Sequence, residues 1–147
     1  MKLILAPGLT RAIERHGVEN YPEEAAGLLL GNPRGEDRYA SRLLALDNKF
    51  QAEQRNRRYL IEPKDMIEAE KKAEELELDI LGVFHSHPDH PARPSEYDRS
   101  QAWPWFVYLI TSIRAGEVAD HRAWQLKEDR SGFIEIPLQL EQVQEAS

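Results

Sequence analysis

The sequence contains no cysteine, and this absence restricts the chemistry open to the chain. Without thiols there can be neither a disulfide framework nor a thiolate metal site. A bound metal would therefore have to rest on histidine and carboxylate ligands, and the chain offers 5 histidines and 26 acidic residues.

The chain also lacks a net positive charge and a long apolar run at its N-terminus. The net charge of −7 argues against a protein that binds a phosphate backbone, so no nucleic-acid partner is expected. At the N-terminus only residues 3–6 are apolar, far fewer than a signal-peptide core or a membrane span needs. We therefore expect no membrane contact and a cytoplasmic location.

The bulk composition is that of a folded protein. Hydrophobic residues make up 41% of the chain and charged residues 31%, which is typical of globular proteins. No repeat, low-complexity tract or long linker divides the 147 residues. We therefore expect one domain that spans residues 1–147.

Hydrophobic periodicity and turn residues predict an order that mixes strands with helices. After an apolar start, helices are expected from Pro7 to the Asn-Tyr-Pro stop at 20–22, from Pro63 to Leu76, and over 95–102. Strands are expected over 25–30, 39–46, 79–85, 105–113, 119–126 and 133–138, with a turn at 31–35. The predicted fold class is α+β (mixed α/β), with a curved, mostly antiparallel β-sheet flanked by helices.

The most informative segment lies between residues 82 and 98. Residues 82–84 are strand-like, so His85 and His87 should point to the same face. Side chains at this spacing lie roughly 6–7 Å apart, and two such imidazoles can converge on one metal ion. Pro88 ends the strand, and Asp98 on the following helix is placed to supply a third ligand. Two histidines and one carboxylate would leave a fourth position for water, as in catalytic zinc sites.

A hydrolytic metal site also needs a group that moves protons. Glu24 is the best candidate, because it is an acidic residue at the start of a predicted buried strand. A carboxyl group near apolar walls tends to have a raised pKa, which suits proton transfer near neutral pH. Ser95 is the candidate hydrogen-bond donor to a developing oxyanion.

These residues also have plain structural interpretations. Ser95 and Asp98 fit a helix capping box, and the two histidines fit a polar pair at the end of a strand. Glu23 competes with Glu24, because strand alternation lets only one of them face the histidines. His90, in the loop after the histidines, is interpreted as solvated.

A polar loop is predicted over residues 48–59. It contains Arg55, Arg57 and Arg58. A solvated surface is the plainer interpretation of these arginines, and binding of an acidic partner surface is the alternative.

The residues singled out above resemble the signature of the JAMM/MPN+ (JAB1/MPN/Mov34) zinc metallopeptidases. That signature joins a remote Glu to His-x-His-Pro and Ser-x-x-Asp, and here the ten positions 88–97 separate His87 from Asp98, as in the family. Residues 22–31 also look like the family's Glu-bearing strand, with Glu24 at the catalytic position. The resemblance extends from about residue 2 to about residue 127 and implies the cytidine-deaminase-like JAB/MPN fold.

The resemblance implies a bound zinc ion (Zn2+) on His85, His87 and Asp98. It further implies Glu24 as general base and then acid, with Ser95 stabilising the tetrahedral intermediate. Short prokaryotic members look like peptidases that process ubiquitin-like sulfur carriers. The expected function is therefore a zinc-dependent peptidase or isopeptidase that hydrolyses an amide bond at the C-terminal tail of a ubiquitin-like (sulfur-carrier) protein.

Two other functions are kept as alternatives. One is a non-catalytic MPN-type scaffold for protein interaction, although such relatives usually lose a ligand. The other is a DNA-repair-associated relative, against which the acidic charge counts. Zinc content would separate enzyme from scaffold, and a salt-dependent gel shift would reveal DNA binding. The carrier, the choice between isopeptide cleavage and C-terminal trimming, and the oligomeric state are left open.

Overall fold

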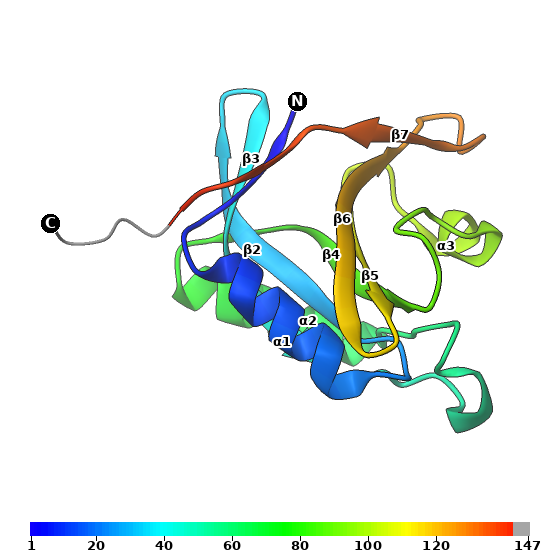
Figure 1. Cartoon of the computed structure of the whole chain (residues 1–147). Coiled ribbons are helices and arrows are strands. Elements are labelled where there is room, and N and C mark those ends of the chain that lie inside the picture. Colours follow the sequence, from blue (N-terminus) through cyan, green and yellow to red (C-terminus); the bar gives the residue numbers. More distant parts are fainter. Residues whose placement is uncertain (143–147) are drawn as a thin grey trace, which may run out of the picture.

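A computed structural model of the chain describes residues 1–142, and residues 143–147 of the predicted domain lie outside the described part (Figure 1). The helices are α1 (Leu9–Asn20), α2 (Pro63–Glu75) and α3 (Glu96–Gln101), with a 3-10 turn at Ala52–Gln54. The strands are β1 (Leu3–Leu5), β2 (Ala26–Arg34), β3 (Asp37–Leu46), β4 (Asp79–Pro88), β5 (Val107–Arg114), β6 (Glu117–Leu126), β7 (Phe133–Ile136) and β8 (Leu138–Leu140).

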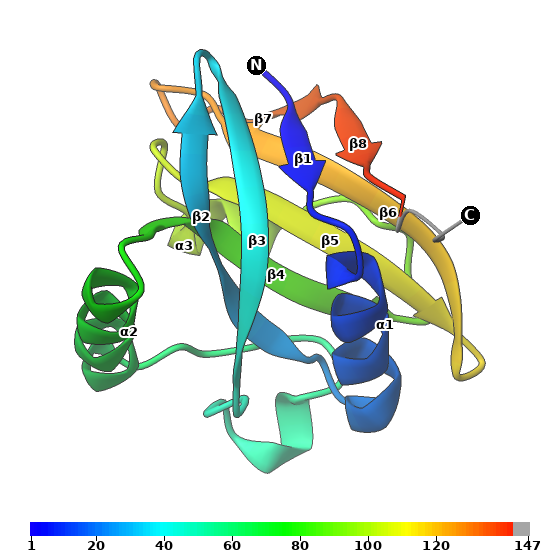
Figure 2. The ribbon, with the colours of Figure 1, turned by 90° about the vertical axis from the view of Figure 1, so that its left-hand side faces the viewer.

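All eight strands belong to one curved sheet in the order β7-β6-β5-β4-β2-β3-β1-β8. Four of the seven neighbouring pairs are antiparallel, whereas β1–β3, β1–β8 and β4–β5 are parallel. The first and last strands, β1 and β8, lie side by side in parallel (Figure 2). The predicted mixed fold class is confirmed, although antiparallel strand pairs outnumber parallel pairs by less than predicted.

The two longer helices cover opposite faces of the sheet (Figure 2). Leu9 and Ile13 of α1 belong to one hydrophobic core, and Ala69 of α2 belongs to a second. Phe84 points into the first core and its neighbour Val83 into the second, as alternation along β4 requires. Burying a side chain such as Phe84 stabilises the fold by about 1.5–3 kcal/mol. Within residues 1–142, no helix has the length and apolar character needed to cross a membrane.

The single strand predicted over residues 133–138 is wrong, because the chain divides at Pro137. Strand β7 pairs with β6 before this residue, and β8 pairs with β1 after it. Proline has no N–H group to donate to a strand ladder. Its carbonyl oxygen instead accepts a hydrogen bond of 3.0 Å from the backbone N–H of Leu3. The segment therefore changes partners at the proline.

The turn predicted over residues 31–35 is also wrong, because β2 continues as far as Arg34. Beyond Gly31, β2 pairs only with β3 and no longer with β4. Pro33 therefore lies in a part of β2 that has a neighbouring strand on one side only. Such an edge position is where a proline is tolerated in a sheet.

Strand β4 lies between β2 and β5 and ends in the His-Ser-His-Pro segment. Its pairing with β2 shifts by one residue between Leu29 and Leu30, which marks a β-bulge. Gly82 follows this bulge and lies directly against β5. A Cβ atom at Gly82 would come within 2.0 Å of the carbonyl oxygen of Val107, so only glycine permits this approach. This close pairing fixes the strand three residues before His85.

Candidate metal centre

His85 and His87 lie on the same face at the end of β4, as their spacing predicts. Their ring centroids are 4.9 Å apart. His85 is fully buried and His87 is 7% exposed. The ring of Tyr59 stacks on His85 with a centroid distance of 4.5 Å and an interplanar angle of 23°. The imidazole of His85 is therefore held by packing as well as by the strand.

Asp98 lies in the first turn of α3 and forms a capping box with Ser95. The backbone N–H of Asp98 donates to Ser95 Oγ at 3.0 Å, and the backbone N–H of Ser95 donates to Asp98 Oδ2 at 2.8 Å. The same Oδ2 atom lies 3.1 Å from Nε2 of His87, while Oδ1 lies 3.7 Å from Nε2 of His85. The helix cap therefore aims the carboxylate at both imidazoles, so the structural interpretation and the ligand interpretation are compatible.

Glu24 lies two residues before the start of β2 and is buried, with 2% of its surface exposed. Its Oε1 atom lies 3.3 Å from Nδ1 of His85 without the angle of a hydrogen bond. Glu23 is only half-buried and does not contact the histidines through an ion pair. Of the two neighbouring acids, Glu24 is thus the one that faces the histidines.

The charges in this cluster shift the pKa of two residues. Burial alone would raise the pKa of Asp98, but the facing imidazoles and the Ser95 N–H hold it well below its usual range. Burial alone would lower the pKa of His85, but the carboxylates of Asp98 and Glu24 outweigh it and raise that pKa. The cluster therefore favours a positive charge between its carboxylates.

The tautomer of His87 also favours a positive charge in the cluster. Its Nδ1 atom lies 2.9 Å from the carbonyl oxygen of Pro91, which can only accept. Nδ1 therefore carries the hydrogen, and neutral His87 presents the lone pair of Nε2 toward Asp98. Two hydrogen-bond acceptors 3.1 Å apart require a proton or a metal ion near them.

Several buried atoms of the cluster also lack partners. Within residues 1–142, Glu24 Oε1 and both ring nitrogens of His85 form no hydrogen bond. Leaving such an atom unsatisfied costs about 1–3 kcal/mol. Glu24, His85 and His87 each place one ligand atom within 4.8 Å of the others. A buried set of imidazole nitrogens and carboxylate oxygens fits zinc, which takes these ligands.

A pocket of about 420 Å³ opens onto the cluster. Glu24, His87 and Ser95 line it, so all five predicted site residues lie at one place in the fold. Ser95 is exposed there, and among residues 1–142 its hydroxyl hydrogen has no acceptor. His90 is exposed in the same pocket but is not among the clustered ligand atoms.

Sequence reasoning missed the part that loop 48–59 plays at the site. Asn48 Nδ2 donates to the carbonyl oxygens of Glu24 at 3.0 Å and of Arg58 at 2.9 Å. The backbone N–H of Glu24 donates to the carbonyl oxygen of Arg55 at 2.6 Å. The loop therefore holds Glu24 in place instead of lying free in solvent. Its polar residues have no periodicity, so no pattern in the sequence indicates these contacts.

Known proteins resemble this chain in sequence. The chain matches the family model for prokaryotic homologs of the JAB domain over residues 7–127. A probable TtuB-protein conjugate cleaving protease of Thermus thermophilus is 30% identical over 116 residues, 77% of this chain and 74% of that protein. A desampylase of Haloferax volcanii is 38% identical over 55 residues, 37% of this chain and 40% of that protein.

Solved structures share the fold. A protein from Desulfitobacterium hafniense is 30% identical with a TM-score of 0.83, covering 96% of this chain and 94% of that one. A protein from Salinibacter ruber is 40% identical with a TM-score of 0.74, covering 96% and 92%. A JAB1/MPN domain protein from Archaeoglobus fulgidus, 20% identical with a TM-score of 0.58 and coverage of 95% and 98%, shows the fold alone. As its motif predicts, the chain belongs to the prokaryotic JAB-domain (JAMM/MPN) family.

Proposed function

We propose that this chain is a zinc-dependent peptidase that hydrolyses an amide bond at the C-terminal tail of a ubiquitin-like protein, with sulfur carriers as the substrate class. The observation that carries the proposal is the buried cluster of imidazoles and carboxylates, in which Glu24 Oε1 and both nitrogens of His85 find no partner among residues 1–142. The name of the Thermus thermophilus relative, a conjugate cleaving protease, supports hydrolysis of a protein-linked amide.

The proposed zinc ligands are His85, His87 and Asp98. Both Nε2 atoms face the Asp98 carboxylate, at 3.7 Å and 3.1 Å, so the three donors surround one space. Glu24 instead faces Nδ1 of His85, which leaves it free for a different task. Zinc held there would supply Lewis-acid chemistry and a water of lowered pKa.

Glu24 is the proposed proton carrier. As the water oxygen attacks the carbonyl carbon of the substrate, Glu24 takes the water's proton. When the carbon–nitrogen bond breaks, Glu24 gives that proton to the departing nitrogen, so a carboxylic acid and an amine leave the site. Burial and the backbone bonds to Asn48 and Arg55 fix Glu24 for this transfer.

Ser95 is the proposed donor to the oxyanion. Its Oγ atom already accepts the backbone N–H of Asp98, which fixes the oxygen at the start of α3. The hydroxyl hydrogen is therefore available to donate to the negatively charged oxygen of the tetrahedral intermediate.

The test measures metal content and cleavage with one preparation. Protein purified without chelator is expected to contain about one zinc per chain and to cleave a sulfur-carrier protein extended by one residue beyond its Gly-Gly end. Mass spectrometry of both products locates the cleaved bond. Protein that carries zinc but leaves extended carriers and lysine-linked carrier conjugates intact would contradict the proposal.

A further inference from the structure

The pocket over the cluster carries positive charge, although the chain is acidic as a whole. Arg57, Arg58 and Arg93 line it, while the net charge of the chain is −7. One of the two acidic residues in the lining belongs to the metal cluster, and the other, Glu96, accepts from Arg99 Nε at 3.0 Å. Within residues 1–142, no carboxylate forms an ion pair with any of the three lining arginines. The pocket therefore presents guanidinium groups without anionic partners.

Arg58 is tied to the catalytic cluster through its backbone. Its N–H donates to the carbonyl oxygen of Gln54 at 3.0 Å, and its own carbonyl accepts from Asn48 Nδ2 at 2.9 Å. The same Asn48 nitrogen donates to the carbonyl of Glu24. The next residue, Tyr59, stacks on His85. Two independent contacts thus fix the position of Arg58 relative to the proposed base and to a proposed zinc ligand.

The guanidinium of Arg58 is held as well. Its central carbon lies 4.8 Å from the ring centroid of Tyr97 and 5.9 Å from that of Phe50, and these two rings meet edge to face. Tyr97 directly precedes Asp98 in α3. Aromatic contacts orient a guanidinium without using its N–H donors, which stay free for a planar anion such as a carboxylate.

The geometry points to a carboxylate-binding subsite formed by Arg58, with Arg57 and Arg93, that binds the free carboxylate of the residue or short peptide released by cleavage. This inference rests on the proposed function and specifies its substrate class. A peptide residue spans about 3.3–3.6 Å, so the carboxylate of a one-residue extension lies within a side chain's reach of the cleaved amide. Arg58 lines the same pocket as Glu24 and His87, and its guanidinium contacts Tyr97, the residue before Asp98.

A carboxylate-binding subsite would affect which type of amide bond the protein cleaves preferentially. An extension with a free chain end presents a carboxylate beside the cleaved amide, whereas an isopeptide bond to a lysine within a protein does not. The subsite therefore favours trimming of a C-terminal extension over removal of a carrier from lysine. An acidic side chain in the carrier tail, before the cleaved bond, is the other possible source of the carboxylate.

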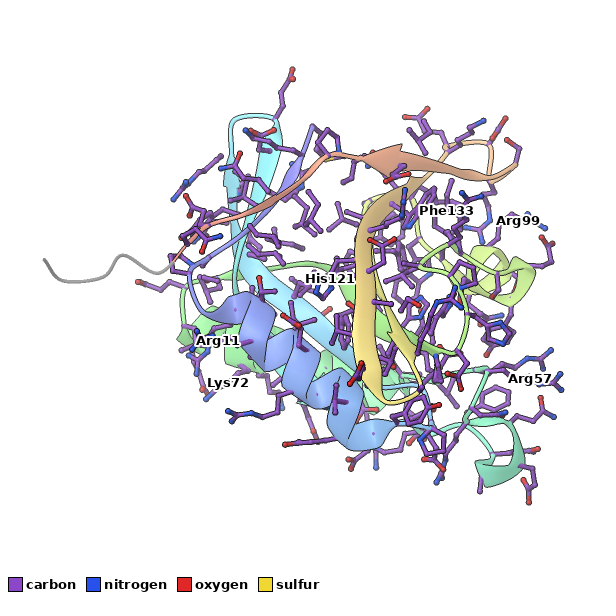
Figure 3. All side chains as sticks on the ribbon, in the orientation of Figure 1. Arg11, Arg57, Lys72, Arg99, His121 and Phe133 are labelled. Carbon is purple, nitrogen blue, oxygen red and sulfur yellow. The ribbon has the colours of Figure 1, made fainter. Side chains whose placement is uncertain are left out.

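The experiment compares two substrates that differ in one group. Both are a sulfur-carrier protein extended past Gly-Gly by one alanine, ending either in a free carboxylate or in a carboxamide. A second pair has every acidic side chain of the carrier tail changed to its amide. Wild type, Arg58→Gln and Arg11→Gln are tested on all four substrates. Arg11 lies on α1, away from Arg57 and the α3 side of the molecule, and is the charge-matched control (Figure 3).

Wild type and Arg11→Gln are expected to prefer the carboxylate roughly tenfold or more in kcat/KM, chiefly through KM, because a charge-assisted hydrogen bond is lost with the amide. In Arg58→Gln the preference should fall to about onefold to threefold. Any general effect of the substitution cancels in this ratio. The second pair should give the same ratios, because the tail acids are not the recognised group.

Three outcomes would overturn the inference: no preference in wild type, an unchanged preference in Arg58→Gln, or a preference that disappears when the tail acids are neutralised. Binding to zinc-loaded Glu24→Gln protein, measured by calorimetry with the carboxylate and carboxamide substrates, gives the same ratio without turnover. If the protein binds the carboxylate substrate preferentially but wild type cleaves neither substrate, the proposed function is contradicted and the subsite is still supported.

Discussion

Nε2 of His87 lies 3.1 Å from Oδ2 of Asp98, and that same oxygen accepts the backbone N–H of Ser95. One carboxylate oxygen therefore caps α3 and faces an imidazole at the same time. The cap fixes the direction of the carboxylate before any cation arrives, so little side-chain freedom is lost on binding. The proposed ligand set would couple helix capping to metal binding at this residue, so a substitution there should affect both.

Replacing Asp98 with Asn should remove zinc and weaken the cap. Substituting a residue that only hydrogen-bonds to a metal ligand costs about 10–100-fold in metal affinity, so loss of a charged ligand should lower zinc affinity by more than about 100-fold. The measurement is zinc per chain after dialysis against a weak chelator. Asp65→Asn is the matched control, because Asp65 has the same place in the capping box of α2. Both variants should lose about 0.5–2 kcal/mol of stability, but only Asp98→Asn should lose zinc. Full zinc retention in that variant would remove Asp98 from the ligand set.

Replacing Glu24 with Gln should separate catalysis from metal binding. The amide cannot carry a proton, so kcat should fall by about 10²–10⁴-fold. Zinc content should stay near that of wild type, because Glu24 faces Nδ1 of His85 and not the space shared with Asp98. Glu23→Gln makes the same change one residue away and should keep full activity. Loss of zinc together with activity in Glu24→Gln would instead make Glu24 a ligand.

Much of the cluster is predictable from sequence because its residues are local to regular elements. His85 and His87 share a face by strand alternation, and Ser95 and Asp98 are joined by the spacing of a helix cap. These relations need no knowledge of the rest of the fold. The family motif adds Glu24, which lies far away in sequence.

Long-range relations are not predictable in this way. The placement of Tyr59 against His85, and of Asn48 between Glu24 and Arg58, depends on how an aperiodic loop folds back on the sheet. The order of the strands depends likewise on pairings between distant segments, such as β1 with β8. Alternation and capping rules apply to neighbours in the chain and say nothing about such contacts.

Replacing Gly82 with Ala should destabilise the domain and disturb the metal site. The new Cβ atom would lie 2.0 Å from the carbonyl oxygen of Val107, so β4 and β5 would have to separate. We expect a loss of about 3 kcal/mol or more in the free energy of unfolding, at the upper end of overpacking effects. Denaturant unfolding measures it. Gly132→Ala, where a Cβ atom meets nothing within 4 Å, should change stability by less than about 1 kcal/mol. Equal effects of the two substitutions would contradict the close approach of the strands.

Above pH 6.5 the stability of the metal-free protein should fall with rising pH, while the additional stability that zinc provides should increase. Without metal, the carboxylates of Asp98 and Glu24 raise the pKa of His85 above its ordinary value of 6.5. A raised pKa in the folded state gives stability that is complete below pH 6.5 and is lost as the pH rises through the folded-state pKa. Zinc requires neutral His85, so its stabilising effect grows as the proton leaves over the same range.

Melting temperatures between pH 6.5 and 8, measured with chelator and with excess zinc, test this relation. Burial lowers the pKa of His121, so its titration affects stability only below pH 6.5 and does not interfere. The lowered pKa of Asp98 acts at still lower pH. The melting temperature of the chelated protein should therefore fall as the pH rises. The difference between its melting temperature and that of the zinc-loaded protein should increase. A gain in stability of the chelated protein across this range would show that His85 does not hold a proton between the two carboxylates. It would contradict the inference that the cluster favours a positive charge at this position.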